Sequence, residues 1–215
     1  TYTPEKIRFA TERVVKAQGG KFVKDRVDRI DPDLKKAYTL SGNEFSYDVL
    51  SFNAGSYVPM PKELKDKDNI YSVKPIERLM ESSERLKVLF QQKKIIVSIV
   101  GGGPSSAEIA GNVWQLAKKT DGFMPQIHIF AGKKFMGHFT DSVRNRIVKY
   151  LVSRGIKIDD TGYVDQITPD TIRLDNGKSI ATDFIYLALG VNPSSIFEAS
   201  GLPVGPDKGL LVNKY

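Results

Sequence analysis

The chain has 215 residues, 40% of them hydrophobic, and a formal net charge of +7. It contains no cysteine, which excludes disulfide bonds, thiolate metal sites and redox chemistry at a cysteine pair. Its two histidines argue against a histidine-rich metal site, and no apolar run reaches the length of a membrane-spanning helix. The positive charge favours an anionic partner such as a nucleotide, a nucleic acid or an acidic lipid, although a solvated basic surface is the simpler explanation.

The first half of the chain predicts short β-strands and then one helix. Apolar and charged residues roughly alternate over 22–30, and a second short strand is expected at 37–40, before a turn. Residues 47–52 predict a buried strand, whereas residues 4–16 fit either an extended or a partly helical segment. Apolar residues at helical spacing predict a helix over 74–91.

The second half alternates strands and helices. Near-continuous apolar runs predict buried strands, and periodic runs predict helices. The alternation indicates a parallel sheet with right-handed crossovers, a Rossmann-like α/β domain, followed by a β-meander over 162–180 and another buried strand over 183–189. The alternating elements are expected at 94–100 (strand), 105–118 (helix), 126–131 (strand), 141–154 (helix) and 156–158 (strand).

A glycine-rich stretch joins the first of these strands to the helix that follows, in the manner of a dinucleotide phosphate loop. Gly101 allows a sharp turn out of the strand, and Gly103 allows the backbone to approach a pyrophosphate without an intervening Cβ. The helix presents free N–H groups and its positive dipole end to the phosphates. The third small residue falls at Ser106, where the helix must pack closely on the strand, so the motif is weakened but kept. We predict dinucleotide binding here, with a purely structural turn as the alternative; the residues concerned are Gly101, Gly102, Gly103, Ser105 and Ser106.

The end of the strand at 126–131 bears on the choice of cofactor. NAD-selective domains usually place an acid there to bind the ribose 2′-hydroxyl. This chain has Phe130 at that position, and Lys133 and Lys134 follow shortly after. A lysine pair fits a 2′-phosphate, which indicates NADPH. A solvated surface pair and a domain that binds neither cofactor are the alternatives.

Three other residues that often carry function are interpreted as structural. His128 lies within an apolar strand and His138 in a turn, and neither has a partner at the spacing of a catalytic triad or a metal site. Trp114 lies on the helix after the glycine loop and is expected to pack against the core. No nucleophile and no metal ligand is predicted.

Three stretches resemble motifs of one family, the FAD-dependent pyridine nucleotide-disulfide oxidoreductases, which bind two dinucleotides. They are VGGGPSSAEIAG at 100–111, YDVLSFNAGS at 47–56 and TDFIYLALGVNPSS at 182–195. The likeness covers about 20–215 and is strongest to type II NADH dehydrogenases and related NADH oxidases. Disulfide reductases and sulfide:quinone reductases of the family need redox cysteines, which this chain lacks.

The resemblance implies a domain organisation. It predicts a partial FAD-binding domain at 1–62, a linker helix at 63–92, an NAD(P)-binding domain at 93–194 and the start of a return to the FAD domain at 195–215. It also implies a parent protein that is longer at both ends, with the phosphate loop for FAD before this chain. FAD is therefore expected to bind the chain alone weakly or not at all.

The resemblance also assigns roles to residues. Glu108 is expected near the contact between nicotinamide and flavin as a catalytic residue, with an acid that stabilises the helix dipole as the alternative. Gly190 and Val191 are expected to line the nicotinamide side of the cleft. The residues expected to approach FAD, unless they only pack at strand ends, are Val27, Ala54 and Gly55.

The implied function is that of an NAD(P)H-dependent flavoprotein oxidoreductase. Hydride would pass from NAD(P)H to FAD, and electrons then to a quinone or another small acceptor. The parent enzyme is expected in the cytoplasm or at a membrane surface, and the present segment alone is expected to be inactive. The alternatives are a binding module similar to apoptosis-inducing factor and a non-catalytic dinucleotide fold. The lysines are spread along the chain, so no nucleic acid is expected as partner, and the oligomeric state is left open.

Overall fold

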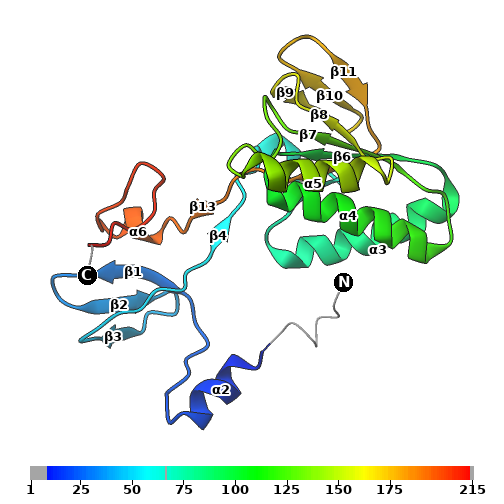
Figure 1. Ribbon diagram of the computed structural model, residues 1–215. Coiled ribbons are helices and arrows are strands. Elements are labelled where there is room, and N and C mark those ends of the chain that lie inside the picture. Colours follow the sequence, from blue (N-terminus) through cyan, green and yellow to red (C-terminus); the bar gives the residue numbers. More distant parts are fainter. Residues whose placement is uncertain (1–8, 66, 214–215) are drawn as a thin grey trace. The chain divides into compact units, whose positions relative to one another are not determined.

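The computed structural model describes residues 9–65 and 67–213, which form two compact units (Figure 1). The first unit holds the described residues up to Gly55 and from Pro193 onward, and the second holds Ser56–Asn192. The chain thus passes between the units twice. The short strands β4 (Ser56–Tyr57) and β13 (Asn192–Pro193), at the two crossings, form a two-stranded sheet.

The second unit is built on a five-stranded sheet whose strand order is β5-β12-β6-β7-β8. All its neighbouring strands are parallel, and β6 and β12 are almost wholly buried, as their apolar runs predict. The predicted α/β fold with a parallel sheet is confirmed. The strands are β5 (Ile70–Ser72), β6 (Ile96–Val100), β7 (Gln126–Phe130), β8 (Lys157–Asp159) and β12 (Phe184–Leu187).

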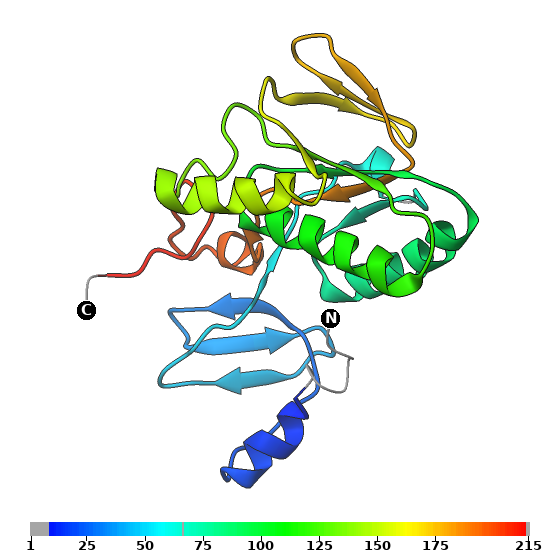
Figure 2. The same ribbon diagram turned by 45° about the vertical axis from the view of Figure 1, so that its right-hand side comes forward.

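Three helices, α3 (Ile76–Gln92), α4 (Pro104–Thr120) and α5 (Asp141–Val152), cover one face of this sheet (Figure 2). Leu86 and Phe90 of α3 are fully buried one helical turn apart, which is the spacing that brings side chains onto one helix face. The buried side chains of the three helices and the sheet form one core cluster. This cluster fixes α4, and with it the loop that precedes α4.

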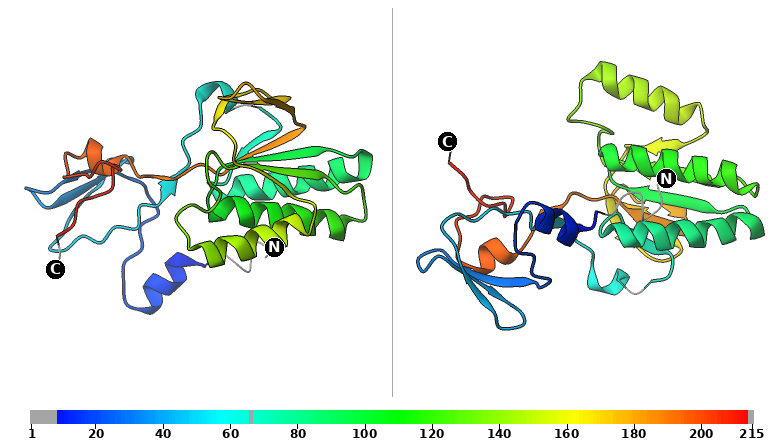
Figure 3. Two further views of the ribbon diagram at one scale, coloured as in Figure 1. Left: turned by 45° about the horizontal axis from the view of Figure 1, so that its top comes forward. Right: turned by 90° about the horizontal axis from the view of Figure 1, so that it is seen from below.

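A β-meander covers the other face of the sheet (Figure 3). Its strands β9 (Val164–Ile167), β10 (Thr171–Leu174) and β11 (Ser179–Ala181) are antiparallel, and they match the β-meander predicted over 162–180. Ile172 and Leu174 alternate inward from β10 and pack against the sheet. The buried residues between the sheet and the meander form a second core cluster. Leu64, from the short 3₁₀ helix η1 (Lys62–Leu64), also belongs to it.

The first unit is small and carries a three-stranded antiparallel sheet of order β1-β2-β3. Phe197 of α6 (Ile196–Ala199) meets Phe52 edge to face with ring centroids 5.2 Å apart, and Ser200 accepts a 3.0 Å hydrogen bond from the backbone of Ile30. No residue of the described helix α2 (Thr11–Ala17) is buried. The strands are β1 (Val27–Asp31), β2 (Lys36–Thr39) and β3 (Glu44–Ser46).

The prediction of a buried strand at 47–52 is wrong. The segment forms no strand, and the side chain of Val49 is 88% exposed. A buried strand needs a hydrogen-bonded neighbour and apolar layers on its faces, and none of the described strands pairs with this segment. The β-structure expected from residue 22 begins only at Val27. Part of the segment 4–16, expected to be extended or partly helical, lies outside the described residues.

A buried hydrogen bond between α3 and β12 gives a test of the core. The Tyr186 hydroxyl donates to Ser82 Oγ at 2.8 Å, and burial raises the pKa of Tyr186 to about 12, so the hydroxyl keeps its proton. Ser82→Ala leaves this hydroxyl without its acceptor and should lower the free energy of unfolding by about 1–3 kcal/mol. Adding Tyr186→Phe should recover most of that loss. Urea denaturation followed by circular dichroism measures both.

The matched control is Ser153→Ala, which removes an exposed hydroxyl that donates to the Tyr150 carbonyl at 2.9 Å. Its effect should stay within about 0.5 kcal/mol, as for other surface substitutions. Equal losses for Ser82→Ala and Ser153→Ala would contradict a stabilising role for the buried pair.

Candidate functional site

The glycine loop connects β6 to α4 at the carboxyl edge of the parallel sheet. Gly101 has φ +143°, and a Cβ there would lie 2.3 Å from the Ala188 carbonyl oxygen. A Cβ on Gly102 would lie 2.6 Å from the Ala131 carbonyl oxygen. Both positions therefore require glycine because other backbone segments lie too close for any side chain.

Gly103 is different, because the described part of the protein does not itself require a glycine there. Its φ of −94° suits any residue, and no described heavy atom outside its chain neighbours lies within 4 Å of the place a Cβ would take. A side chain on Gly103 would project into open space at the start of α4. A backbone exposed in this way fits a ligand that approaches it closely.

The space in front of the loop is a cleft of about 490 Å³. It lies at the carboxyl ends of β6, β7 and β12, which is where ligands bind in open parallel sheets. The described first turn of α4, a helix of 17 residues, carries no acid and no side-chain cap, so its positive dipole end is left for an anion. Besides Val100, the cleft is lined by 101–105, 130–132, 163–164 and 188–191.

The two serines of the loop point in different directions. Ser105 is exposed and lines the cleft. Ser106 is fully buried, and a Cβ on Gly101 would lie 3.0 Å from its Oγ. Ser106 therefore packs helix against strand and is not among the residues that line the cleft. Its Oγ has no hydrogen-bond partner among the described residues.

The predicted lysine pair separates in the structure. Phe130 ends β7, is 2% exposed and lines the cleft. Lys133 Nζ lies 5.7 Å from the centre of the Tyr163 ring, and Tyr163 also lines the cleft. Lys134 Nζ lies 3.9 Å from an oxygen of Asp141 and borders a different cavity. Neither lysine is among the residues that line the cleft, and only Lys133 lies over the ring of one of them, Tyr163.

Of the remaining residues predicted for the site in the second unit, two line the cleft and one does not. Gly190 and Val191 line the cleft beyond β12, as an approach to nicotinamide would need. Glu108 is exposed, is not among the cleft residues and makes no ion pair with another described residue. It lies beyond the first turn of α4, which weakens the alternative that it stabilises the helix dipole.

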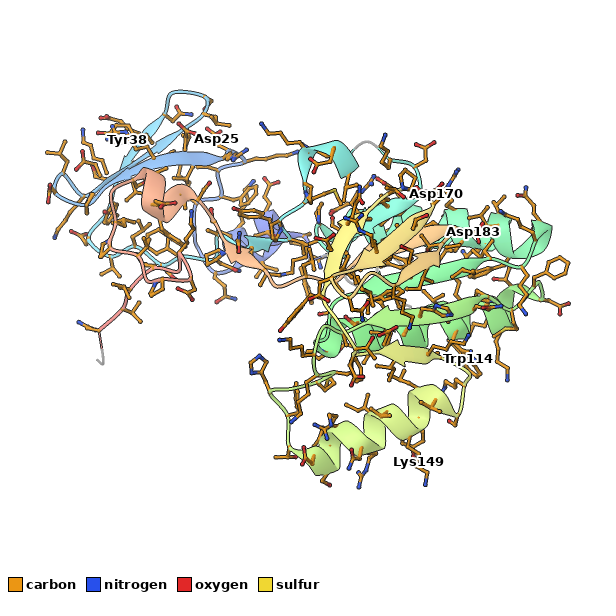
Figure 4. The ribbon with its side chains drawn as sticks, turned by 90° about the horizontal axis from the view of Figure 1, so that it is seen from above. Asp25, Tyr38, Trp114, Lys149, Asp170 and Asp183 are labelled. Carbon is orange, nitrogen blue, oxygen red and sulfur yellow. The ribbon has the colours of Figure 1, made fainter. Side chains whose placement is uncertain are left out.

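The residues expected near FAD lie in the first unit. Val27 and Ala54 line a cavity of about 550 Å³, whereas Gly55, with φ +71°, is not among its residues. Asp25, labelled in Figure 4, borders this cavity, and hydrogen bonds led by that from Ser41 lower its pKa to about 2. Asp25 therefore places a negative charge at the rim of this cavity, beside the positive charge of Arg26, which also lines it.

Sequence reasoning missed several cleft residues. Gly132 and Leu189 lie two residues beyond the ends of β7 and β12, so the rule that ligands bind at carboxyl ends could have found them. Tyr163 comes from the start of the meander, and no local pattern marks it. Its ring packs so close that a Cβ on Gly132 would lie 2.6 Å from it.

Trp114 and His128, both interpreted as structural from the sequence, lie in different surroundings. Trp114, labelled in Figure 4, packs against the core, with Lys118 Nζ 4.9 Å and the Arg154 guanidinium carbon 5.1 Å from its ring centre. His128 lies in β7 and lines the same cavity as Lys134. Among the described residues, no group of three His, Cys, Asp or Glu could hold a metal ion.

A glycine loop between a buried parallel strand and a helix N-terminus, beside an open cleft, defines a Rossmann-like dinucleotide-binding domain. The chain belongs to the pyridine nucleotide-disulphide oxidoreductase family, whose sequence profile matches residues 3–215. The resemblance noted from the sequence is thereby confirmed.

Relatives with curated names share about a quarter of their residues with the chain. Apoptosis-inducing factor homolog A of Dictyostelium discoideum is 26% identical, over 89% of this chain and 49% of its own length. A type II NADH:quinone oxidoreductase of Staphylococcus saprophyticus is 25% identical, over 100% and 57%. An NADH dehydrogenase-like protein of Mycobacterium tuberculosis is 24% identical, over 85% and 47%. The chain spans about half the length of these relatives.

Solved structures share the fold at lower identity. The water-forming NADH oxidase of Lactobacillus brevis, bound to NADH, superposes with a TM-score of 0.74 at 22% identity, over 96% of this chain and 46% of its own. A ferredoxin reductase of Rhodopseudomonas palustris gives 0.76 at 19% identity, over 98% and 51%. These likenesses confirm the α/β fold of the chain.

Two alanine substitutions in the loop should lower the free energy of unfolding by different amounts. Gly101→Ala combines a left-handed backbone with a Cβ 2.3 Å from a carbonyl oxygen, and should cost more than about 2 kcal/mol of unfolding free energy. Gly103→Ala meets no described atom and should cost less than about 1 kcal/mol. Chemical denaturation compares the two, and similar losses would refute the assignment of Gly103 to ligand approach.

Proposed function

We propose that this chain binds NAD(P)H as part of a flavoprotein oxidoreductase. The observation that carries the proposal is Gly103: the described protein leaves room for a side chain there, yet the sequence has none. A pyrophosphate that packs on the loop backbone accounts for this, with the free end of α4 as its electrostatic partner. Membership of the family supports the same conclusion.

The chemistry proposed for the parent enzyme is hydride transfer. Bound NAD(P)H supplies a hydride and FAD accepts it, and this chemistry belongs to the cofactors. The chain's part is to hold and orient them. Gly190 and Val191 are proposed to contact nicotinamide and Glu108 to act near the reacting groups. The residues proposed to approach FAD are Val27, Ala54 and Gly55.

A quinone is the proposed electron acceptor, because one relative is named an NADH:quinone oxidoreductase and covers the whole of this chain. Another small acceptor is the second choice. Among the described helices none is long and apolar enough to cross a membrane. We propose a cytoplasmic parent enzyme that reaches a lipid-soluble quinone from the membrane surface.

The alternative of a module similar to apoptosis-inducing factor is less well supported. The relative of that name is 26% identical to the chain, and relatives named for NADH oxidation reach 24% and 25% over similar spans. Identity therefore does not single out the apoptosis-inducing factor branch. A scaffold that binds no dinucleotide is disfavoured by the room that the described protein leaves in front of Gly103.

The first test is dinucleotide binding by Gly103→Ala. Since the new methyl group enters the cleft without disturbing described neighbours, affinity for NADH and NADPH should fall at least tenfold while the protein stays folded. Nicotinamide fluorescence measures binding, and circular dichroism confirms folding. Unchanged affinity in the folded variant would refute pyrophosphate binding at this loop.

The second test concerns the 2′-phosphate. Phe130 supplies no acid for a ribose hydroxyl, and Lys133 lies beside the cleft. NADPH should therefore bind more tightly than NADH. Lys133→Gln should reduce that preference about three- to tenfold, the size expected when one ion pair of about 1 kcal/mol is lost.

Lys134→Gln is the matched control, because Lys134 faces Asp141 and the other cavity. It should leave the preference within a factor of two. Equal effects of the two substitutions would show that the lysines act as a pair. A preference for NADH would rule out binding of a 2′-phosphate by either lysine.

A further inference from the structure

A cavity of about 930 Å³ lies at the open edge of the sheet and not at the glycine loop. The outermost strand β8, its neighbour β7, helix α5 and strand β11 surround it, and we call it the edge groove. Its volume lies in the range of small-molecule sites. Phe135, Val148, Ile156 and Ile180 give it apolar walls.

Basic side chains outnumber acidic ones at the rim of the edge groove. Lys134, Arg144, Lys157 and Lys178 line it together with the carboxylates of Asp159 and Asp160. Asp141 pairs with both Lys134 and Arg144. Lys178 pairs with Asp159. Lys157 makes no ion pair with any described carboxylate. An apolar interior with an unbalanced cation at its mouth matches the chemistry of an amphipathic anion.

His128 supplies a polar group that the described protein leaves unused. It lines the groove from β7, beside Lys157 in strand register, and its Nε2 is buried without a hydrogen-bond partner among the described residues. Burial first, and then the charges of Lys157 and Lys178, lower the pKa of His128, so the ring is neutral at neutral pH. Buried polar atoms are rarely left unpaired, so a bound ligand is a reasonable partner.

The edge groove is distinct from the dinucleotide cleft. Of the residues that line the two cavities, only Phe130 belongs to both. Its side chain is 2% exposed and forms a wall between them. The two lysines after β7 also separate, with Lys133 on the side of the cleft and Lys134 on the side of the groove.

We propose that the edge groove is a second binding site, for an organic anion with an apolar body. The apolar body packs between α5 and β8, the anionic group meets Lys157, and a hydrogen-bonding atom meets His128 Nε2. The proposal goes beyond the proposed oxidoreductase function and does not depend on it, because no residue of the glycine loop takes part.

The test uses the 215-residue chain and 8-anilinonaphthalene-1-sulfonate, a fluorescent apolar anion, in the presence of saturating NADPH. Saturable binding of one probe per chain is expected. N-phenyl-1-naphthylamine has the same aromatic body without the sulfonate, and it should bind at least fivefold more weakly. Equal affinity for the two probes would overturn the role of the cationic rim.

Two pairs of variants locate the binding. Val152 lines the groove and Val143 does not, and both are exposed on α5, so Val152→Trp should abolish probe binding and Val143→Trp should not. Likewise Lys157→Gln should weaken binding about three- to tenfold, and Lys149→Gln on the outer side of α5 should leave it unchanged. Circular dichroism checks that each variant is folded.

The possible results separate the two proposals. Probe binding that survives Val152→Trp and Lys157→Gln in folded protein would overturn the groove as its site. Competition between the probe and NADPH for one site would show that the groove is only an extension of the cleft. Failure of NADPH to bind, with probe binding lost only in the groove variants, would count against the proposed function and leave the second site standing.

Discussion

The close approach of three strand ends at Gly101 is the constraint on which the rest of the second unit depends. The backbone N–H of Gly101 donates to the Phe130 carbonyl at 2.9 Å, and that of Ala188 donates to the Val100 carbonyl at 2.8 Å. These bonds tie β6 to both its neighbours where the sheet ends, and they leave no space for a Cβ on Gly101. The floor of the cleft is therefore backbone, and α4 starts at a fixed place above it.

Local patterns predicted most of the second unit, because most of its strands and helices are specified by features within each segment. The edge strand β5 (Ile70–Ser72) was not predicted. An apolar run such as 96–100 is buried wherever both faces of a sheet are covered, and Gly155, with φ +75°, ends its helix without reference to distant residues. The segment 47–52 has a similar apolar character, yet Val49 is exposed. A strand of this kind depends on a partner elsewhere in space, which a local pattern cannot supply.

In the candidate site, too, the local sequence predicted some residues, and others depend on contacts between distant segments. Three glycines and a following helix mark the loop in the sequence, and the loop is where they predicted it. Tyr163 lines the cleft from a segment about 60 positions further along the chain, and no pattern in the neighbouring sequence predicts this. Lys133 and Lys134 are adjacent in sequence but diverge, because the turn that carries them is held by a 2.7 Å bond from Met136 N–H to the Gly102 carbonyl.

Strand β7 connects the two cavities through the simple alternation of its side chains. Ile127 and Ile129 point to the helices and join their core, and His128 and Phe130 point to the opposite face. One strand thus supplies the buried imidazole of the edge groove and the wall that the groove shares with the cleft. Since Phe130 lines both cavities, displacement of this ring by a ligand in one cavity would alter the shape of the other. Any such coupling must be reciprocal, because linkage requires each ligand to change the other's affinity by the same factor.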